Sequence, residues 1–353
     1  MRGLNKRPFF YILLSAVLFG ISTPLSKLLI REISPVGLAG LLYLGAFLGL
    51  ALYSFGTKIF DQKKKIEAPP LRRRDIGWLT GAIISGGILA PICLFYGLKK
   101  TFGYSASLLL NLEGVATALI AVLIFKENAG RRIWLALVGM TCAGVFLSWD
   151  PRQGRFLPTG SLLILFSMTC WGIDNNFTRN ISDRDPVQIA KIKGMAAGVF
   201  SIALAITLGM KIPMDMTLFW GLCLGAFSYG LSLVLYIRAL GGLGAFRAGA
   251  FFSVAPFVGA VASLLILREP ISWVFVPGTI FMILGVILVI NEKHEHHHRH
   301  EKSTHTHAHY HGDGHHRHKH AGHVREPHSH EHMHEETVHI HGHWPDIHHR
   351  HGH

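Results

Sequence analysis

Charged residues are scarce in this chain of 353 residues: only 16% are Asp, Glu, Lys or Arg, and 50% are hydrophobic. In a soluble domain of similar length about a quarter of the residues are charged, because charged side chains cover its water-facing surface. The composition therefore excludes an ordinary soluble globule and predicts an all-α membrane protein.

Histidine is absent from residues 1–293, and all 25 histidines lie between His294 and His353. The chain thus consists of an apolar body and a His-rich tail. The body has no imidazole with which to hold a metal ion.

The body also lacks signatures of enzymes and of ATP-driven pumps. Its four cysteines lie singly in apolar stretches without CxxC spacing, and no GxxxxGK[ST] loop occurs. We expect no enzymatic activity and no required cofactor. The formal net charge of +13 resides mainly in short loops between apolar stretches, so the expected partner is a lipid bilayer and not nucleic acid.

Ten apolar stretches precede the tail, each about long enough to cross the hydrocarbon as a helix. They span residues 9–30, 36–55, 76–98, 102–125, 133–149, 161–179, 187–209, 218–240, 243–267 and 273–290. We expect ten transmembrane helices.

The two sets of five stretches resemble each other. Phe19-Gly20-Ile21 corresponds to Trp171-Gly172-Ile173, Pro35 to Pro186, and Glu127 to Glu269. Because five is odd, the second copy enters the membrane from the opposite side, which is typical of secondary transporters with a site between their halves. The predicted units are residues 1–150 and 151–293, each a five-helix repeat, and the tail at 294–353.

Loop charge predicts the orientation. Basic residues are concentrated at the N-terminus and between the second and third stretches, and such loops remain cytoplasmic. Ten crossings then place both termini in the cytoplasm, and we expect the cytoplasmic membrane of a bacterium.

Three stretches carry a family resemblance: FGISTPLSKLLIREISPVGLAGLLYLGA, ASLLLNLEGVATALIAVLIFKE and YIRALGGLGAFRAGAFFSVAPFVGAVASLLILREP. They resemble the two repeats of the EamA family in the drug/metabolite transporter superfamily. The resemblance covers residues 9–291 and implies ten helices in two inverted halves around a cavity, with outward transport of small metabolites. Where the family usually has a second mid-helix proline, matching Pro256, this chain has Gly114.

Few ionisable residues lie inside the apolar stretches, where a charge must pair or face water. Glu113 lies midway along the fourth stretch with Asn111 beside it, and it is our candidate for binding a proton or a cation. A packing role, with the carboxylate tied to a neighbouring helix, is the alternative.

A second polar group lies on the sixth and seventh stretches. Asp174 and Asn175 lie toward the end of the sixth, and Lys191 and Lys193 lie in the seventh. Residues two apart on a helix point about 200° apart, so only one lysine can face a cavity. We expect Lys193 to face it, pairing with Asp174 either as part of the site or as a structural ion pair, and Lys191 to reach the interface.

Other polar and aromatic residues fit structural roles. Lys27 and Arg179 are expected to anchor helix ends at the interface, and Trp171 either stacks on a substrate or, as we favour, packs. Pro24, Pro91, Pro256 and Pro277 are expected to interrupt helices.

The tail should bind metals. Neutral imidazoles bind Ni, Zn, Co and Cu, and the densest candidate ligands are His294, His296, His297, His298, His315, His316, His330, His332, His334, His348 and His349. Two HExxH matches begin at His294 and His330, but this composition gives about one by chance. With few apolar residues to bury, the tail is expected to be disordered without metal.

Two functions remain open. The body exports a small organic solute, with protons as a possible coupling ion, while the tail buffers or senses cytosolic metal. Alternatively, the body exports divalent Ni, Co or Zn that the tail delivers, although it contains only isolated acids and no paired carboxylates.

Overall fold

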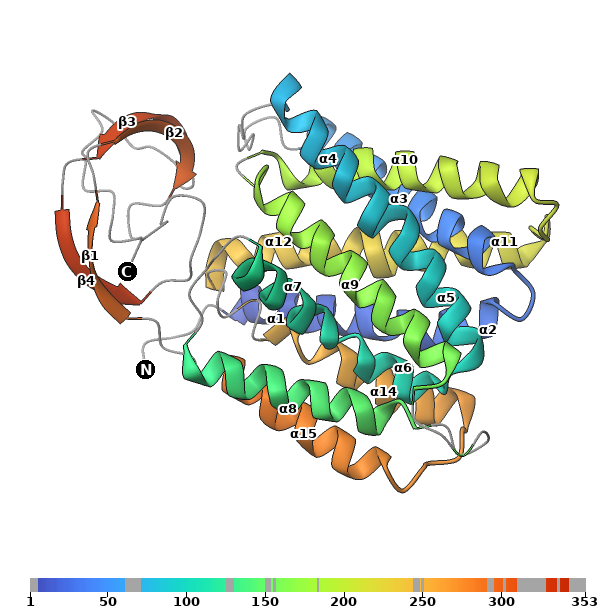
Figure 1. Cartoon of the computed structure of the whole chain (residues 1–353). Helices are drawn as coiled ribbons and strands as arrows, with labels where there is room; N and C mark the ends of the chain where they lie inside the picture. The colour runs from blue at the N-terminus through green and yellow to red at the C-terminus, as the bar shows by residue number, and fades with distance from the viewer. Residues whose placement is uncertain are drawn as a thin grey trace.

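A computed structural model describes most of the apolar body and four segments of the tail. The described residues are 6–60, 71–124, 130–149, 154, 157–182, 184–243, 248, 251–290, 295–300, 303–309, 328–334 and 337–342. The body is helical, and its helices form one bundle (Figure 1).

Ten helical elements are described in the first half of the body. They are α1 (Lys6–Gly20), α2 (Ser22–Leu29), α3 (Pro35–Phe60), the 3₁₀ turn η1 (Arg73–Asp75), α4 (Ile76–Ala82), the π-helix η2 (Ile83–Leu89), α5 (Ala90–Lys100), α6 (Gly103–Leu109), α7 (Leu112–Leu123) and α8 (Arg131–Leu147).

The second half contains seven described elements. They are α9 (Thr159–Arg179), α10 (Pro186–Thr207), α11 (Met216–Leu224), the π-helix η3 (Gly225–Leu231), α12 (Ser232–Leu243), α14 (Ala255–Leu267) and α15 (Phe275–Ile290).

Six of the described segments are long and apolar enough to cross a membrane: Arg7–Leu29, Pro35–Gly56, Arg73–Lys100, Gly103–Leu123, Pro186–Thr207 and Met216–Ala239. Two shorter apolar helices, Ala255–Leu267 and Phe275–Val289, follow. The prediction of a helical membrane protein is therefore supported.

Helices from the two halves interleave (Figure 1). The long helices α3 and α10 pack together, and α8 lies beside α15. Likewise α1 packs on α12 and α14, while α9 packs on α5 and α7. The main core, which includes Leu38, Tyr104 and Ile164, draws on elements of both halves.

Several membrane-length segments are interrupted near their middle. Between α6 and α7, the N–H groups of Asn111 and Glu113 donate to carbonyls three residues earlier, at 3.1 Å each, instead of four. Before α14, the N–H of Val254 donates to the oxygen of Phe251 at 3.3 Å. Such 3₁₀ turns inside helices are typical of functional or strained positions.

Three of the four expected proline interruptions coincide with changes in the helix. Pro24 follows the junction of α1 and α2, Pro91 is the second residue of α5 after η2, and Pro256 is the second residue of α14. Pro277 was predicted wrongly: it lies in the first turn of α15, where an N–H has no intrahelical partner and proline is tolerated.

The expectation of a disordered tail differs from the structure. Four short strands are described there, β1 (Glu295–His300), β2 (Ser303–His309), β3 (His328–His334) and β4 (Thr337–Gly342). β1 pairs with β4 and β2 with β3, both antiparallel. Thr, Val and Ile alternate with His in parts of these strands, and β-branched residues favour extended backbone.

Candidate functional site

The candidate residues Asp174 and Lys193 contact each other directly. Asp174, near the end of α9, accepts a hydrogen bond from the Lys193 ammonium on α10 and forms an ion pair with it. The Asp174 side chain is 6% exposed and that of Lys193 18%. Thr178 also donates to Asp174 Oδ1 at 3.0 Å. The contact raised by the sequence is present, and its role in transport remains a prediction.

Glu113 and Asn175 form a second contact, between α7 and α9. Asn175 Nδ2 donates to Glu113 Oε1 at 2.7 Å and lies 3.1 Å from Thr117 Oγ1. Thr117 in turn donates to the backbone oxygen of Glu113 at 2.8 Å. Within the described residues no ion pair joins Glu113 to a cation, so its recorded side-chain partner is a neutral amide.

Asn111 lies at the break between α6 and α7, one residue before α7 begins. Its Nδ2 is buried and has no hydrogen-bond partner in the described part of the chain. The five predicted residues therefore divide into two bonded pairs and a buried amide donor at a helix break.

Next to the ion pair, one backbone carbonyl accepts hydrogen bonds from two aromatic residues. The sequence patterns did not group these two residues together. The Gly86 oxygen, in the π-helix η2, accepts from Tyr43 OH at 2.7 Å and from Trp171 Nε1 at 2.9 Å. A Cβ at Gly86 would collide with the Asp174 carboxylate. Glycine is thus required where Asp174, Tyr43 and Trp171 converge, and the packing role expected for Trp171 fits its buried position.

An aromatic wall continues from Tyr43 into the second π-helix. The ring centroids of Tyr43 and Tyr229 of η3 are 6.1 Å apart, and Phe19 of α1 lies 5.7 Å from Tyr229. Phe252 lies 5.4 Å from Phe19. The sequence signal that could have indicated the two π-helices is a short triplet in the middle of each apolar stretch, Ser-Gly-Gly in η2 and Ser-Tyr-Gly in η3.

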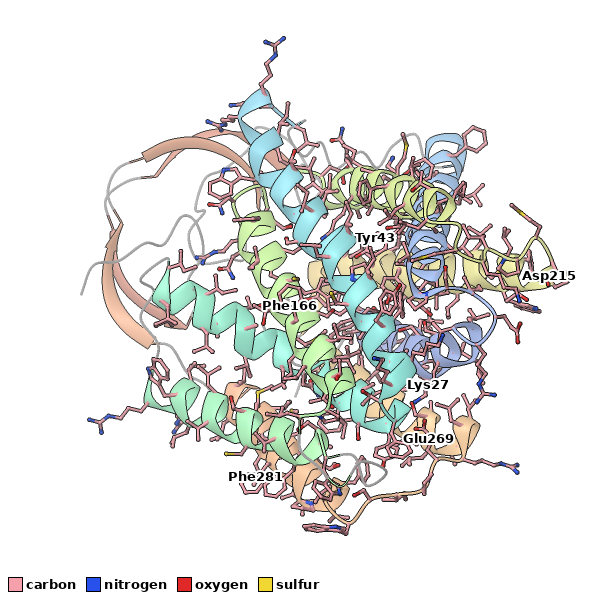
Figure 2. The ribbon with its side chains drawn as sticks, turned by 45° about the vertical axis from the view of Figure 1, so that its right-hand side comes forward. Lys27, Tyr43, Phe166, Asp215, Glu269 and Phe281 are labelled. Carbon is pink, nitrogen blue, oxygen red and sulfur yellow. The ribbon has the colours of Figure 1, made fainter. Side chains whose placement is uncertain are left out.

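One end of the bundle carries an ion pair that the sequence did not predict. Lys27 Nζ lies 2.8 Å from Glu269 Oε1 and also donates to the Thr101 oxygen. Glu269 Oε2 accepts from the Gly103 N–H at 2.6 Å, and Figure 2 shows Lys27 and Glu269 together at this end. A carboxylate 242 positions away therefore holds the Lys27 ammonium, and the interface role of Lys27 stays a prediction.

The opposite end of the segment Arg73–Lys100 carries another buried pair. Arg184 Nε donates to Asp75 Oδ2 at 2.7 Å, and the side chains are 2% and 6% exposed. The backbone N–H of Arg72 also donates to Asp75 Oδ2, at 2.8 Å. Charged contacts therefore join helices near both ends of the bundle and at the Asp174–Lys193 pair.

These features define a helical membrane protein with polar groups held among apolar helices. The model of the EamA-like transporter family matches residues 6–149 and 158–291. The chain belongs to the EamA-like transporter family.

Curated relatives agree with a transport role. An uncharacterized transporter of Methanothermobacter thermautotrophicus is 28% identical over 291 residues, covering 79% of this chain and 84% of that protein. The uncharacterized transporter YetK of Bacillus subtilis is 21% identical over 303 residues, covering 83% and 90%. The family and these relatives together indicate a membrane transporter.

A crystal structure of another protein shares the fold. It is 15% identical, has a TM-score of 0.58, and the match covers 81% of this chain and 96% of that one. At this identity the likeness concerns the fold alone.

Proposed function

We propose that this transporter crosses the membrane ten times, as two oppositely inserted repeats covering residues 1–150 and 151–293, with both ends in the cytoplasm. Support comes from two equivalent contacts, each of which joins a helix of one half to a helix of the other. Gly172 of α9 approaches α7 so closely that a Cβ would lie 2.9 Å from Thr117 N, and a Cβ on Gly259 of α14 would lie 2.7 Å from the Gly20 oxygen of α1. The described part of each half also contains one π-helix, η2 or η3.

The proposed transport function is export of a small metabolite or drug-like solute by alternating access. The candidate site consists of Glu113, Asn111, Asp174, Asn175 and Lys193. One observation carries the proposal: Lys193 forms an ion pair with Asp174, whereas Glu113 is hydrogen-bonded to an amide and forms no ion pair with a described residue. A carboxyl group so placed can exchange a proton or bind a cationic group, since an unpaired charge in the membrane interior is costly.

Proton coupling through Glu113 is tested in proteoliposomes loaded with a pH-sensitive dye. A panel of amino acids and ethidium is added under an imposed pH gradient. Glu113→Gln should abolish solute-dependent proton movement, while Glu32→Gln, which removes an exposed carboxylate 3.6 Å from Lys211, should leave it unchanged. Full gradient-driven transport by the Glu113 variant would refute this role.

Metal binding by the tail is a separate part of the proposal. The backbone register of β2 and β3 sets His305 opposite His332 and His307 opposite His330, and opposite positions share one face of a strand pair. His294, His315, His316, His348 and His349 lie outside the described residues. Calorimetric titration of Ni or Zn should lose most binding sites when the chain is truncated after Glu292; unchanged stoichiometry would contradict tail binding.

Metal export by the body is the second candidate. The His-rich strands favour it, and the body argues against it: among the described side chains, no group of three or more His, Cys, Asp or Glu could hold a metal ion. A deletion strain rescued with full-length or tailless protein separates the two. Metal resistance restored only by the tailed form supports metal export, and metabolite resistance restored by both forms supports solute export.

A further inference from the structure

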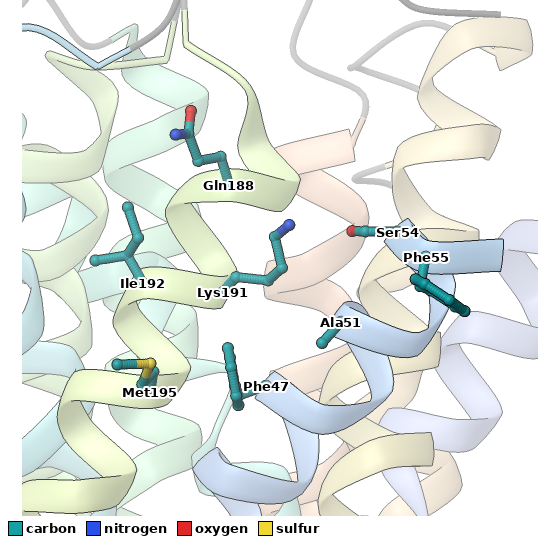
Figure 3. A pocket seen from close by; sticks show the side chains of 8 residues that line it. All are labelled: Phe47, Ala51, Ser54, Phe55, Gln188, Lys191, Ile192 and Met195. Carbon is teal, nitrogen blue, oxygen red and sulfur yellow. The ribbon is translucent and has the colours of Figure 1, made fainter. Parts of the chain in front are cut away.

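A groove between α3 and α10 lies apart from the candidate site. Its volume is about 440 Å³, and its walls include Phe47 and Ala51 of α3 and Ile192 and Met195 of α10 (Figure 3). Ile192 is 38% and Met195 52% exposed. The groove is therefore an apolar surface on the outside of the bundle, where lipid surrounds a membrane protein.

Polar side chains occupy one end of this groove. Lys191 extends from α10 toward Ser54 of α3, with Gln188 one turn before it (Figure 3). Lys191 is five residues past the first residue of α10, about 7.5 Å along the axis. The polar end of the groove thus lies near the membrane–water boundary.

The two lysines of α10 have different surroundings. Lys193 pairs with Asp174, whereas Lys191 has no recorded ion pair or hydrogen bond to any described residue. α3 itself carries Lys58 near its end, and the segment that follows it contains Lys63, Lys64, Lys65 and Arg72. An occupant of the groove should be anionic at one end and apolar along its length.

We infer that the groove binds one anionic phospholipid of the leaflet at the start of α10, the cytoplasmic leaflet in the proposed orientation. The Lys191 ammonium and the Gln188 amide bind the headgroup phosphate. An acyl chain lies against Phe47, Ala51 and Met195. The inference concerns a lipid site that is separate from the transported solute.

Native mass spectrometry of the delipidated full-length protein tests this site. Phosphatidylglycerol and phosphatidylcholine with identical acyl chains are added in equal amounts, and the retained adducts are counted. Wild-type protein should retain one phosphatidylglycerol in preference. Lys191→Gln should lower that preference about fivefold, since one basic residue near an anionic headgroup contributes about that factor.

Lys99→Gln is the matched control, because Lys99 is an exposed lysine in the last turn of α5. It should leave the preference unchanged. Equal retention of both lipids by wild-type protein, or equal losses in the two lysine variants, would overturn the inference.

The apolar part of the site has its own test. Ala51→Phe should fill the groove and reduce retention of both lipids, whereas Val199→Phe, at an exposed position of α10 outside the groove lining, should not. Glycerol phosphate, which has no acyl chain, should not displace the bound lipid. Displacement by it, or unchanged retention in Ala51→Phe, would contradict a phospholipid site.

Discussion

The α7–α9 contact and the α14–α1 contact use the same close approach but carry different chemistry. In α9 the sequence after Gly172 is Ile173-Asp174-Asn175-Asn176, and in the first half the sequence after Gly20 is Ile21-Ser22-Thr23-Pro24. The first contact holds Glu113, Asn175 and the Asp174–Lys193 pair, whereas hydroxyl groups and a proline occupy the second. The comparison indicates that small residues maintain the packing in both contacts, so the charged groups can be confined to one of them.

The same positions also explain why one helix is continuous and the other is not. Asn176 Nδ2 donates to the Gly172 oxygen at 2.8 Å while α9 continues to Arg179. Pro24, at the matching position, has no N–H for the Gly20 oxygen, and α1 ends at Gly20. The freed carbonyl lies against Gly259 of α14.

The largest expected effect is at Asp174. Asp174→Ala leaves the Lys193 ammonium without its partner and should lower the free energy of unfolding by about 3–5 kcal/mol, measured in mixed micelles titrated with denaturing detergent. Ser22→Ala, at the matching position of the first half, should cost about 1 kcal/mol. Equal losses of unfolding free energy in the two variants would show that the ion pair adds no more stability than the hydroxyl group at the matching position.

An intermediate effect is expected at the shared glycines. Gly20→Ala and Gly172→Ala place a methyl group against neighbouring backbone and should each cost about 1–3 kcal/mol, read from the same titration. Gly114→Ala is the control, because no atom lies within 4 Å of its added Cβ. A loss of stability in only one of these two variants would show that the two contacts are not equivalent.

The smallest expected effect is at the matching starts of α3 and α10. Ser34 Oγ accepts from the Gly37 N–H at 3.2 Å, and Asp185 Oδ1 from the Val187 N–H at 2.8 Å. Ser34→Ala and Asp185→Ala should each lower stability by about 1 kcal/mol, seen as a small fall in thermal midpoint. Ser34→Asp should retain the cap; a fall equal to that of Ser34→Ala would argue against capping.

The sequence predicted what depends on local pattern. Apolar stretches gave the helices, and the scarcity of charges in the apolar body made Asp174 and Lys193 natural partners. The role of the Gly86 oxygen as a hydrogen-bond acceptor could not be predicted, because that oxygen lies in a π-helical turn that hydropathy does not encode. Glu269 was not recognised as the partner of Lys27, since their contact depends on how α2 and α14 meet. The strands of the tail were missed because composition alone suggested disorder.

The Lys27–Glu269 pair joins three chain segments at one end of the bundle, because it also binds the Thr101 carbonyl and the Gly103 amide between α5 and α6. Any rearrangement that separates α2 from α14 must break this ion pair with its hydrogen bonds and hydrate an ammonium and a carboxylate. Opening of the bundle at that end therefore costs free energy whether or not a solute occupies the candidate site.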